Sequence, residues 1–305
     1  MIAQLLTLIR REFWEHRSIW VTPLAIGILV TLGVMAMLVF ASGFAKELDL
    51  AIFGAQNLTG DNERRIGLIL FFLGTSWIFL IALAFLIVFY TLDSLYTERK
   101  DKSILFWRSL PVTDAETVVS KLLTAVFVLP LIMCAGIFVT HLINLNLTSI
   151  WVAAKGGAAG ALIWGSVPII DTWLFTLVVV ISGAIWMSPF IGWFLLVSAW
   201  TKRMPLLVAF MPIIVVPLLE WIVFRTRFFA SAVGERNDNL PIFRGMDVED
   251  FFEDKEWMHS IQELRLLEFL DIGKFLTHPE TWLGIIVCGL LTTAAIYVRR
   301  FRDES

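Results

Sequence analysis

Ten formal charges are concentrated in residues 93–121, which read DSLYTERKDKSILFWRSLPVTDAETVVSK and lie between two long apolar segments. Five acidic and five basic side chains make this stretch too polar for the hydrocarbon core of a membrane. Its middle nevertheless holds four large apolar side chains in succession, Ile104, Leu105, Phe106 and Trp107. A loop that only joined two helices would not need such a run, so we expect another surface to cover it.

The local signals on either side of this run predict a helix, a break and a second helix. Pro111 disfavours helical backbone at Leu110, while Thr113 and Glu116 have the T-x-x-E spacing of a capping box. We therefore expect a short helix over residues 100–109 and a freshly capped helix that begins after Thr113.

Motifs of catalysis and of nucleotide binding are missing from the sequence. There is no G-x-x-x-x-G-K-[ST], no H-E-x-x-H and no serine in a nucleophile-elbow pattern. The histidines are scattered at His16, His141, His259 and His278. We therefore expect no catalytic, cofactor-binding or metal site in this chain, which we do not expect to be an enzyme, and any nucleotide binding must come from a partner.

The composition indicates a polytopic membrane protein. The 305 residues are 58% hydrophobic and 17% charged, and several runs of about 20 residues carry no charge, the length that crosses a bilayer core as a helix. No basic stripe suggests nucleic acid as a partner. We expect one all-α transmembrane domain over residues 1–305, in contact with membrane lipid. Its six spans are predicted at residues 19–41, 66–92, 117–143, 170–200, 206–224 and 281–298.

The first 18 residues have an apolar face at helical spacing, so residues 1–18 should form an interfacial helix on the membrane surface. The polar residues of this segment, including Arg11 and Glu12, lie mostly off that face. Basic residues follow the apolar run, the reverse of a signal peptide, so we expect the segment to be retained.

The basic residues of the short connections predict which side each connection faces. With a cytoplasmic N-terminus, the inner side would carry Arg10, Arg11, Arg17, Arg99, Lys100, Lys102, Arg108, Lys121, Lys202, Arg203, Arg299, Arg300 and Arg302. The short outer loops would carry Lys46, Arg64, Arg65 and Lys155. This bias of thirteen to four places both termini inside.

Two outer segments differ in character. Residues 144–169 are rich in Gly and Ala and suit either a loop or a shallow membrane hairpin. Residues 225–279 hold eleven acidic and seven basic residues, and we expect an extracytoplasmic helical segment there. One amphipathic helix is predicted near residues 258–275, separated from the last span by Pro279. The carboxylates lack a calcium-loop pattern.

A proline-interrupted span could line a transport path. Pro212 and Pro217 each remove a backbone hydrogen bond within residues 206–224, and a kink that serves only packing is the plain alternative. Glu220 is a carboxylate at the end of this span. An ionisable group at that depth suggests a contact that lines or gates the exit, the alternative being a solvated Glu paired with Arg225 or Arg227.

Three stretches resemble bacterial ABC-2 type transporter permeases. They are REFWEHR at 11–17, ERKDKSILFWRSLPVTD at 98–114 and SPFIGWFLLVSAWTKRMPLLVAFMPIIVVPLLE at 188–220. The resemblance implies that residues 93–116 form a cytoplasmic coupling loop whose short helix docks into an ABC ATP-binding subunit. The expected docking residues are Glu98, Arg99, Ile104, Leu105, Phe106 and Trp107.

The same resemblance implies an ATP-driven exporter in the bacterial inner membrane. This chain would pair with a second copy of itself or a homologous permease, and two ATP-binding subunits would bind ATP and Mg. Three alternatives remain at this point: a loop helix that rests on lipid headgroups, a secondary transporter or channel not driven by ATP, and an intramembrane enzyme.

Overall fold

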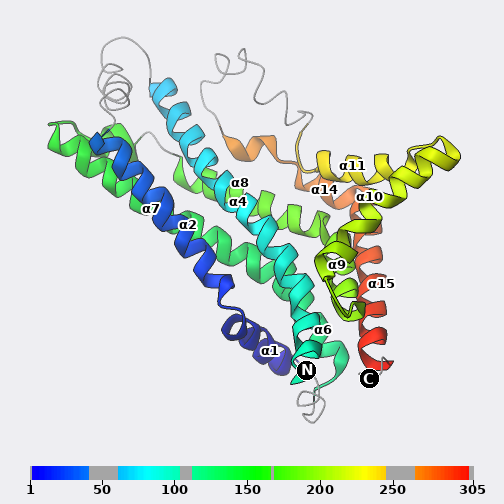
Figure 1. The fold of residues 1–305 in the computed structure, drawn as a ribbon. Helices are drawn as coiled ribbons and strands as arrows, with labels where there is room; N and C mark the ends of the chain where they lie inside the picture. Colours follow the sequence, from blue (N-terminus) through cyan, green and yellow to red (C-terminus); the bar gives the residue numbers. More distant parts are fainter. Residues whose placement is uncertain (1, 41–60, 104–111, 166–167, 245–264, 302–305) are drawn as a thin grey trace.

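The computed structural model describes residues 2–40, 61–103, 112–165, 168–244 and 265–301. These residues form helices and turns, with a single isolated bridge between Phe243 and Leu270 and no strand among them. Figure 1 shows that α1 and the last turn of α15 reach the same end of the bundle, beside the start of α6. We call this the α1 end. The predicted all-α class is confirmed.

The elements follow one another along the chain as a series of long helices with short irregular joints. The first half contains α1 (Ile2–Glu15), α2 (Ser18–Phe40), α4 (Asp61–Lys100), α6 (Asp114–Leu123), the π-helical η2 (Thr124–Val128) and α7 (Leu129–Ala154). The second half contains the π-helical η3 (Gly160–Trp164), α8 (Ile169–Trp186), α9 (Ser188–Trp200), α10 (Pro205–Phe224), α11 (Phe228–Asp238), the 3-10 turn η4 (Leu266–Phe269), α14 (Ile272–Thr277) and α15 (Pro279–Phe301).

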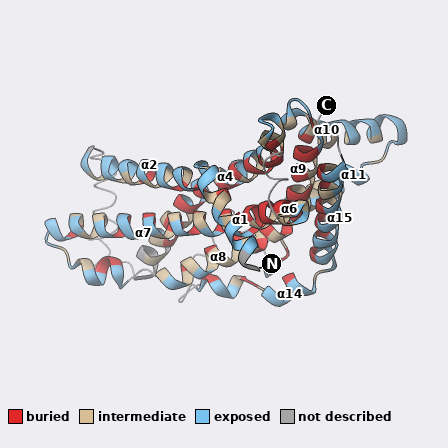
Figure 2. Ribbon diagram, turned by 90° about the horizontal axis from the view of Figure 1, so that it is seen from below, coloured by how far each residue is buried: buried red, intermediate tan, exposed pale blue. Residues whose placement is uncertain are grey.

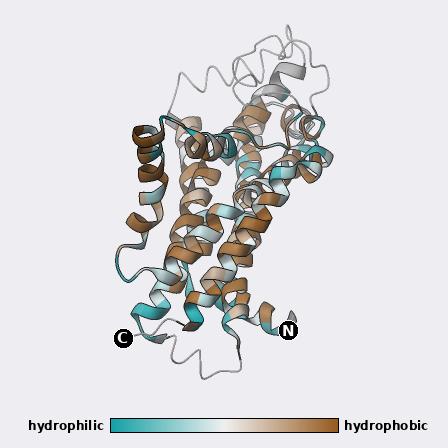
Figure 3. Ribbon diagram, turned by 90° about the vertical axis from the view of Figure 1, so that its right-hand side faces the viewer, coloured by the Kyte–Doolittle hydropathy of each residue, from teal (hydrophilic) through white to brown (hydrophobic). Residues whose placement is uncertain are grey.

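Six helical segments of the described chain are long and apolar enough to cross a membrane, as predicted. They are Ser18–Val39, Gly67–Lys100, Asp114–Ala154, Gly160–Trp186, Pro205–Phe224 and Pro279–Phe301. Figure 3 shows their brown apolar middle zone and the teal polar residues at the α1 end. The protein is therefore a multi-pass membrane protein.

The second span extends beyond its predicted end, which corrects the position of the charged loop. Residues 93–100 continue α4, whereas the sequence analysis placed a loop from residue 93. No Pro or Gly lies between Asp93 and Lys100, so the backbone continues its own hydrogen-bonding pattern past the apolar residues. The described part of the loop therefore begins at Asp101.

The predicted fourth span, 170–200, is two helices that meet at Met187. Pro189 lacks an N–H and occupies the first turn of α9, a position where a helix begins easily. The amide of Phe190 donates to the Met187 carbonyl (3.1 Å), so the Trp186 carbonyl loses its usual helical partner.

Arg236 of α11 supplies donors to that carbonyl. Its Nη2 and Nε lie 2.8 and 3.0 Å from Trp186 O, and the Trp186 indole donates back to Arg236 O over 2.6 Å. The guanidinium also lies over the indole ring, 4.3 Å from its centroid. The helix break between α8 and α9 is thus stabilised by α11, the helix that follows α10.

The Gly- and Ala-rich stretch 144–169 is partly helical and partly folded back. α7 continues to Ala154, and the chain turns at Gly156, whose φ of +83° is a conformation that glycine adopts freely. Leu162 and Ile163 of η3 then pack with Leu145 and Val152 of α7. The described residues of this stretch therefore fold back as a helical hairpin rather than as an irregular loop.

The predicted helix at 258–275 is wrong where it can be compared, because residues 265–275 form a 3-10 turn, the bridge at Leu270 and the first turn of α14. Residues 258–264 lie outside the described part. Asp171 at the start of α8 accepts hydrogen bonds from the amides of Leu266 (2.7 Å) and Leu267 (3.4 Å). This contact holds the turn against the bundle. α15 begins at Pro279, two residues before the predicted start of the last span.

The tightly packed core lies around α9, which packs against α4 and α15. Figure 2 shows the buried residues gathered in α6, α9 and the adjoining half of α4, while α2 and α7 extend away with exposed surfaces. A Cβ at Gly192 would lie 3.1 Å from the Cys288 carbonyl, so this glycine permits the close approach of α9 and α15. Both cysteines are buried and free.

Candidate functional site

The last turn of α4 and the start of α6, which flank the predicted coupling loop, lie close to one another at the α1 end. Glu98 and Arg99 occupy the last turn of α4. Thr113 caps α6 through the predicted capping box, in which Glu116 N donates to Thr113 Oγ1 (3.1 Å) and Thr113 N donates to Glu116 Oε2 (3.0 Å). Ile104, Leu105, Phe106 and Trp107, with most of the predicted helix 100–109, lie outside the described residues.

Glu98 is buried and receives three cationic side chains. It is 2% exposed, although it lies in a segment that the sequence analysis placed in a loop. Arg299 Nη1 lies 2.6 Å from Glu98 Oε2, and Lys121 Nζ and Arg11 Nη2 each lie 3.1 Å from Oε1. These cations come from α15, α6 and α1, so one carboxylate joins four helices.

Glu12 is the second buried carboxylate, and its position corrects the expected polar face of the interfacial helix. The sequence analysis placed it off the apolar face, yet Glu12 is 1% exposed and points into the bundle. Lys121 Nζ lies 2.8 Å from its Oε1, and the Tyr90 hydroxyl donates to its Oε2 over 2.9 Å. α1 is therefore attached to the bundle by charge as well as by apolar contact.

These contacts form a balanced set of charges, which we call the buried ion-pair network. Its members are Arg11, Glu12, Glu98, Asp114, Lys121 and Arg299. The last link is the pair Arg299 Nε and Asp114 Oδ1, 2.9 Å apart. Three basic and three acidic side chains compensate one another; four of them are buried, while Arg11 and Asp114 are partly buried and Arg11 also pairs with the more exposed Glu15 at 2.8 Å. Such a set adds little net stability over apolar packing, but removing one of the buried members leaves an uncompensated buried charge, which is strongly destabilising.

The network surrounds the ends of the charged loop. The loop of residues 101–113 begins one turn after Glu98 and ends before Asp114, the first residue of α6. Glu98 and Asp114 both accept hydrogen bonds from Arg299. One set of ion pairs therefore joins α1, α4, α6 and α15 at the two ends of the loop.

Arg99 fixes the same loop end to α9. Its Nη2 donates to the carbonyls of Ser198 (2.5 Å) and Thr201 (2.7 Å) at the end of α9, where helix carbonyls lack partners and favour a cation. The Ser198 hydroxyl in turn donates to Leu92 O over 2.7 Å. Glu98 and Arg99, both predicted to dock the partner subunit, therefore make different contacts in this chain. Glu98 belongs to the network, and Arg99 binds the carbonyls at the end of α9.

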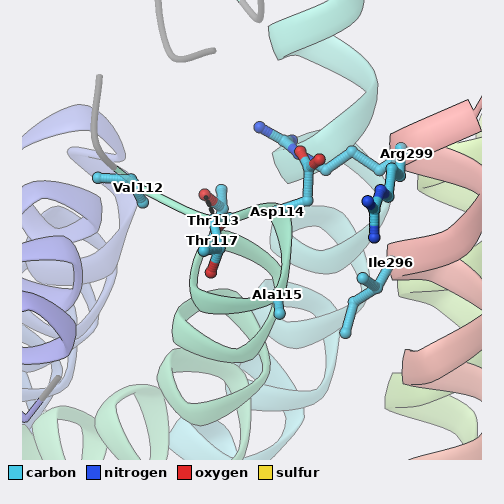
Figure 4. Close-up of a pocket in the computed structure, with 8 residues that line it drawn as sticks. Val112, Thr113, Asp114, Ala115, Thr117, Ile296 and Arg299 are labelled. Carbon is cyan, nitrogen blue, oxygen red and sulfur yellow. Dashed lines mark hydrogen bonds and ion pairs between the residues drawn. The ribbon is translucent and has the colours of Figure 1, made fainter. Parts of the chain in front are cut away.

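A pocket of about 500 Å³ opens beside the network. Figure 4 shows the side chain of Asp114 beside that of Arg299 at the pocket wall, with Ile296 and Ala115 below them. Its walls are formed by Val112, Thr113, Asp114, Ala115, Thr117, Ile296, Arg299 and Arg300. The pocket therefore presents both signs of charge next to an apolar floor, where the loop enters α6. In the described chain, no group of three or more His, Cys, Asp or Glu side chains could hold a metal ion.

The candidate path residues lie apart from this site. Pro212 and Pro217 are both inside α10, which runs as one helix from Pro205 to Phe224. Glu220 accepts hydrogen bonds from the amides of Phe228 (2.7 Å) and Phe229 (2.9 Å) and from the Thr226 hydroxyl (2.8 Å). Glu220 therefore stabilises the start of α11. Neither sequence interpretation, a path contact or a pairing with Arg225 or Arg227, predicted this contact.

Of the six network members, only Glu98 was among the predicted site residues. Sequence reasoning missed the other five, which are Arg11, Glu12, Asp114, Lys121 and Arg299. One signal was available: Lys121 falls inside the predicted span 117–143, and an ionisable side chain within a span requires a partner. Nothing local identifies that partner, because Glu12 and Glu98 lie 109 and 23 residues away along the chain.

The fold and the network define a multi-pass α-helical membrane protein in which ion pairs join four helices at the two ends of a polar loop. Residues 66–233 match the family described as ABC-2 family transporter protein. This match covers more than half of the chain, and the protein belongs to that family. No curated protein and no solved structure matches it. The matched region runs from α4 into α11, so α1 and α15 contribute to the network from outside it.

Proposed function

We propose that this chain is the permease subunit of an ATP-driven ABC-2 exporter, coupled to separate ATP-binding subunits through residues 93–116. Membership of the family implies association with an ABC ATP-binding subunit. The observation that supports coupling is the buried ion-pair network, which joins both ends of the loop to α1 and α15. A partner bound to the loop would then move the helices as a unit.

The proposed division of labour follows from the motifs of the chain. Without a phosphate-binding loop in its sequence, the permease would supply the path, while two partner subunits would bind ATP and Mg and hydrolyse the nucleotide. A second copy of this chain, or a homologous permease, would complete the path. α10 is suited to face either lipid or that second copy. The structure describes the whole of this helix, and Ala209 is the only one of its residues that is buried.

The docking role of the loop is tested by removing its apolar side chains. Leu105→Ala with Phe106→Ala should give a stable, inserted permease that no longer co-purifies with its ATP-binding subunit. Burial of each side chain contributes about 1.5–3 kcal/mol, so the pair should weaken the contact by about a hundredfold or more. Individual charges on the rim should matter less, about 0–1 kcal/mol each.

A matched control removes the same side-chain types elsewhere. Leu70→Ala with Phe85→Ala truncates residues on the exposed surface of α4, which are 39% and 61% exposed. This variant should retain the ATP-binding subunit. Wild-type pull-down and substrate-stimulated hydrolysis in the loop variant would overturn the coupling role. Poor insertion with normal association would instead support a helix that rests on headgroups.

The proposed location is the bacterial inner membrane with both termini and the loop in the cytoplasm. Single cysteines introduced at Ser231 or Ser305 in intact cells provide the test. An impermeant thiol reagent should label position 231 and leave position 305 unlabelled. The reverse pattern would invert the proposed orientation.

A further inference from the structure

A group of buried polar side chains lies between α4 and α7, away from the ion-pair network. Its members are Thr75 and Ser76 on α4 and His141 and Asn144 on α7. His141 and Asn144 are each 1% exposed, and the ring of His141 packs against Phe72 with centroids 4.4 Å apart. None of the hydrogen bonds within this group involves a charged side chain.

The hydroxyl groups determine which nitrogen of His141 carries the proton. Thr75 Oγ1 and Ser76 Oγ donate to the Phe72 carbonyl over 2.9 and 2.8 Å, and a hydroxyl has one proton to donate. His141 Nε2 lies 3.1 Å from Thr75 Oγ1 and 3.5 Å from Ser76 Oγ. Nε2 must therefore be the donor in these contacts, and in a neutral ring Nδ1 is left as an acceptor.

Three hydrogen-bonding atoms of this group are buried without a partner in the described structure: His141 Nδ1, Asn144 Nδ2 and Asn144 Oδ1. The two residues are three positions apart on α7, so their side chains lie on the same face of the helix. This face offers one lone pair, one amide donor group and one amide oxygen. Buried polar atoms of this kind are normally satisfied by protein or by ordered water.

We propose that His141 and Asn144 form an internal water-binding site between α4 and α7. An occupant that bridges the two side chains donates to His141 Nδ1 and either accepts from Asn144 Nδ2 or donates to Asn144 Oδ1. It must also be neutral, because no carboxylate or cationic group takes part in the hydrogen bonds of the site. Water has this donor and acceptor capacity. A cation would face the amide donor without a negative ligand, and an exported substrate cannot reach side chains that are 1% exposed.

The site can be tested by solid-state NMR of the full chain in lipid bilayers, with ¹⁵N in the histidine rings and the asparagine amides. The chain contains four histidines, so the His141 signals can be assigned by His141→Phe. If that variant fails to insert, replacing each of the other three histidines with Gln assigns them by elimination. The expected signal is a neutral ring protonated at Nε2, with an Nδ1 resonance shifted by hydrogen bonding and correlated with water protons.

Asn144→Leu should move the Nδ1 resonance, because the bound water loses its second partner. Asn146→Leu is the matched control on the same helix, since Asn146 Nδ2 is exposed and donates to the Leu142 carbonyl over 2.7 Å. It should leave the His141 ring unchanged. A ring protonated at Nδ1, an Nδ1 free of any hydrogen bond, or a through-bond coupling between Asn144 Nδ2 and His141 Nδ1 would each overturn the proposal.

Discussion

Arg299 Nη1 donates to Glu98 Oε2 over 2.6 Å and so joins two helix ends that are 201 residues apart in the sequence. The same guanidinium contacts Asp114 at the start of α6. One side chain of the last helix therefore contacts the residues on both sides of the charged loop.

Lys121→Met should destabilise the protein because Glu12 and Glu98 would both lose a buried cation. Breaking one partner of a buried pair costs about 3–5 kcal/mol. Lys121→Met combined with Glu12→Gln should cost less than the sum of the single changes, since the second change removes one of the unpaired charges. Chemical unfolding in detergent measures these differences.

The control for this series is Lys100→Met, at the exposed end of α4. A surface change of this kind should alter the free energy of unfolding by less than about 0.5 kcal/mol. Equal losses for Lys100→Met and Lys121→Met would show that the network has no special energetic role.

Local patterns and long-range contacts differ in how well they could be predicted. The T-x-x-E of Thr113 and Glu116 predicted a capping box because both partners lie within one turn, and the apolar runs predicted six spans. The ion pair of Glu12 and Lys121 joins residues 109 positions apart, and its formation depends on how α1 packs. The break at Met187 depends on Pro189, which alone is compatible with either a new helix or a continued one.

Glu220→Ala should loosen the start of α11, because the Glu220 carboxylate accepts hydrogen bonds from two backbone amides there. Loss of a capping side chain costs about 0.5–2 kcal/mol. Hydrogen exchange of the Phe228 and Phe229 amides should accelerate in this variant.

Glu220→Gln separates the capping role from the predicted path role. Its carbonyl can still accept a hydrogen bond, so α11 should change less than in Glu220→Ala. Slower export in the Gln variant, with normal insertion and normal amide protection, would support a path contact. Export at the wild-type rate would show that capping of α11 is the only role of Glu220.

Gly284→Ala should release Arg236 from Trp186. A Cβ at Gly284 would lie 2.8 Å from Arg236 Cζ, whereas one at Gly289 would meet nothing within 4 Å. Both glycines are in α15, and the change to Ala favours helix by up to about 1 kcal/mol in each case. Gly289→Ala should therefore be neutral or stabilising in thermal unfolding, and Gly284→Ala should be destabilising. Equal melting temperatures would contradict the clash.

Acid should weaken the attachment of α1 through His16. Burial lowers the pKa of His16 below its ordinary 6.5, although Glu12 opposes the shift. The unfolded chain then binds a proton more readily than the folded one, so stability is present above about pH 6.5 and is lost as the pH falls through the folded-state pKa.

Thermal unfolding at pH 7.5 and at pH 5.5 can detect this loss. The wild type should lose more stability between these values than His16→Gln, which cannot titrate. A larger loss in the Gln variant would reverse the sign of the proposed effect.

The contact between Arg299 and Glu98 also sets an order of events during biosynthesis. Arg299 follows Lys121 by about 180 residues, which at about 5–20 residues per second is a delay of roughly 10–35 s. Throughout that interval the ribosome has delivered Glu12, Glu98 and Lys121 but not the guanidinium that joins Glu98 to Asp114. Until α15 arrives, Glu98 therefore has cationic partners from α1 and α6 only, and a chain that stalls before Arg299 leaves the contact between α4 and α15 unmade.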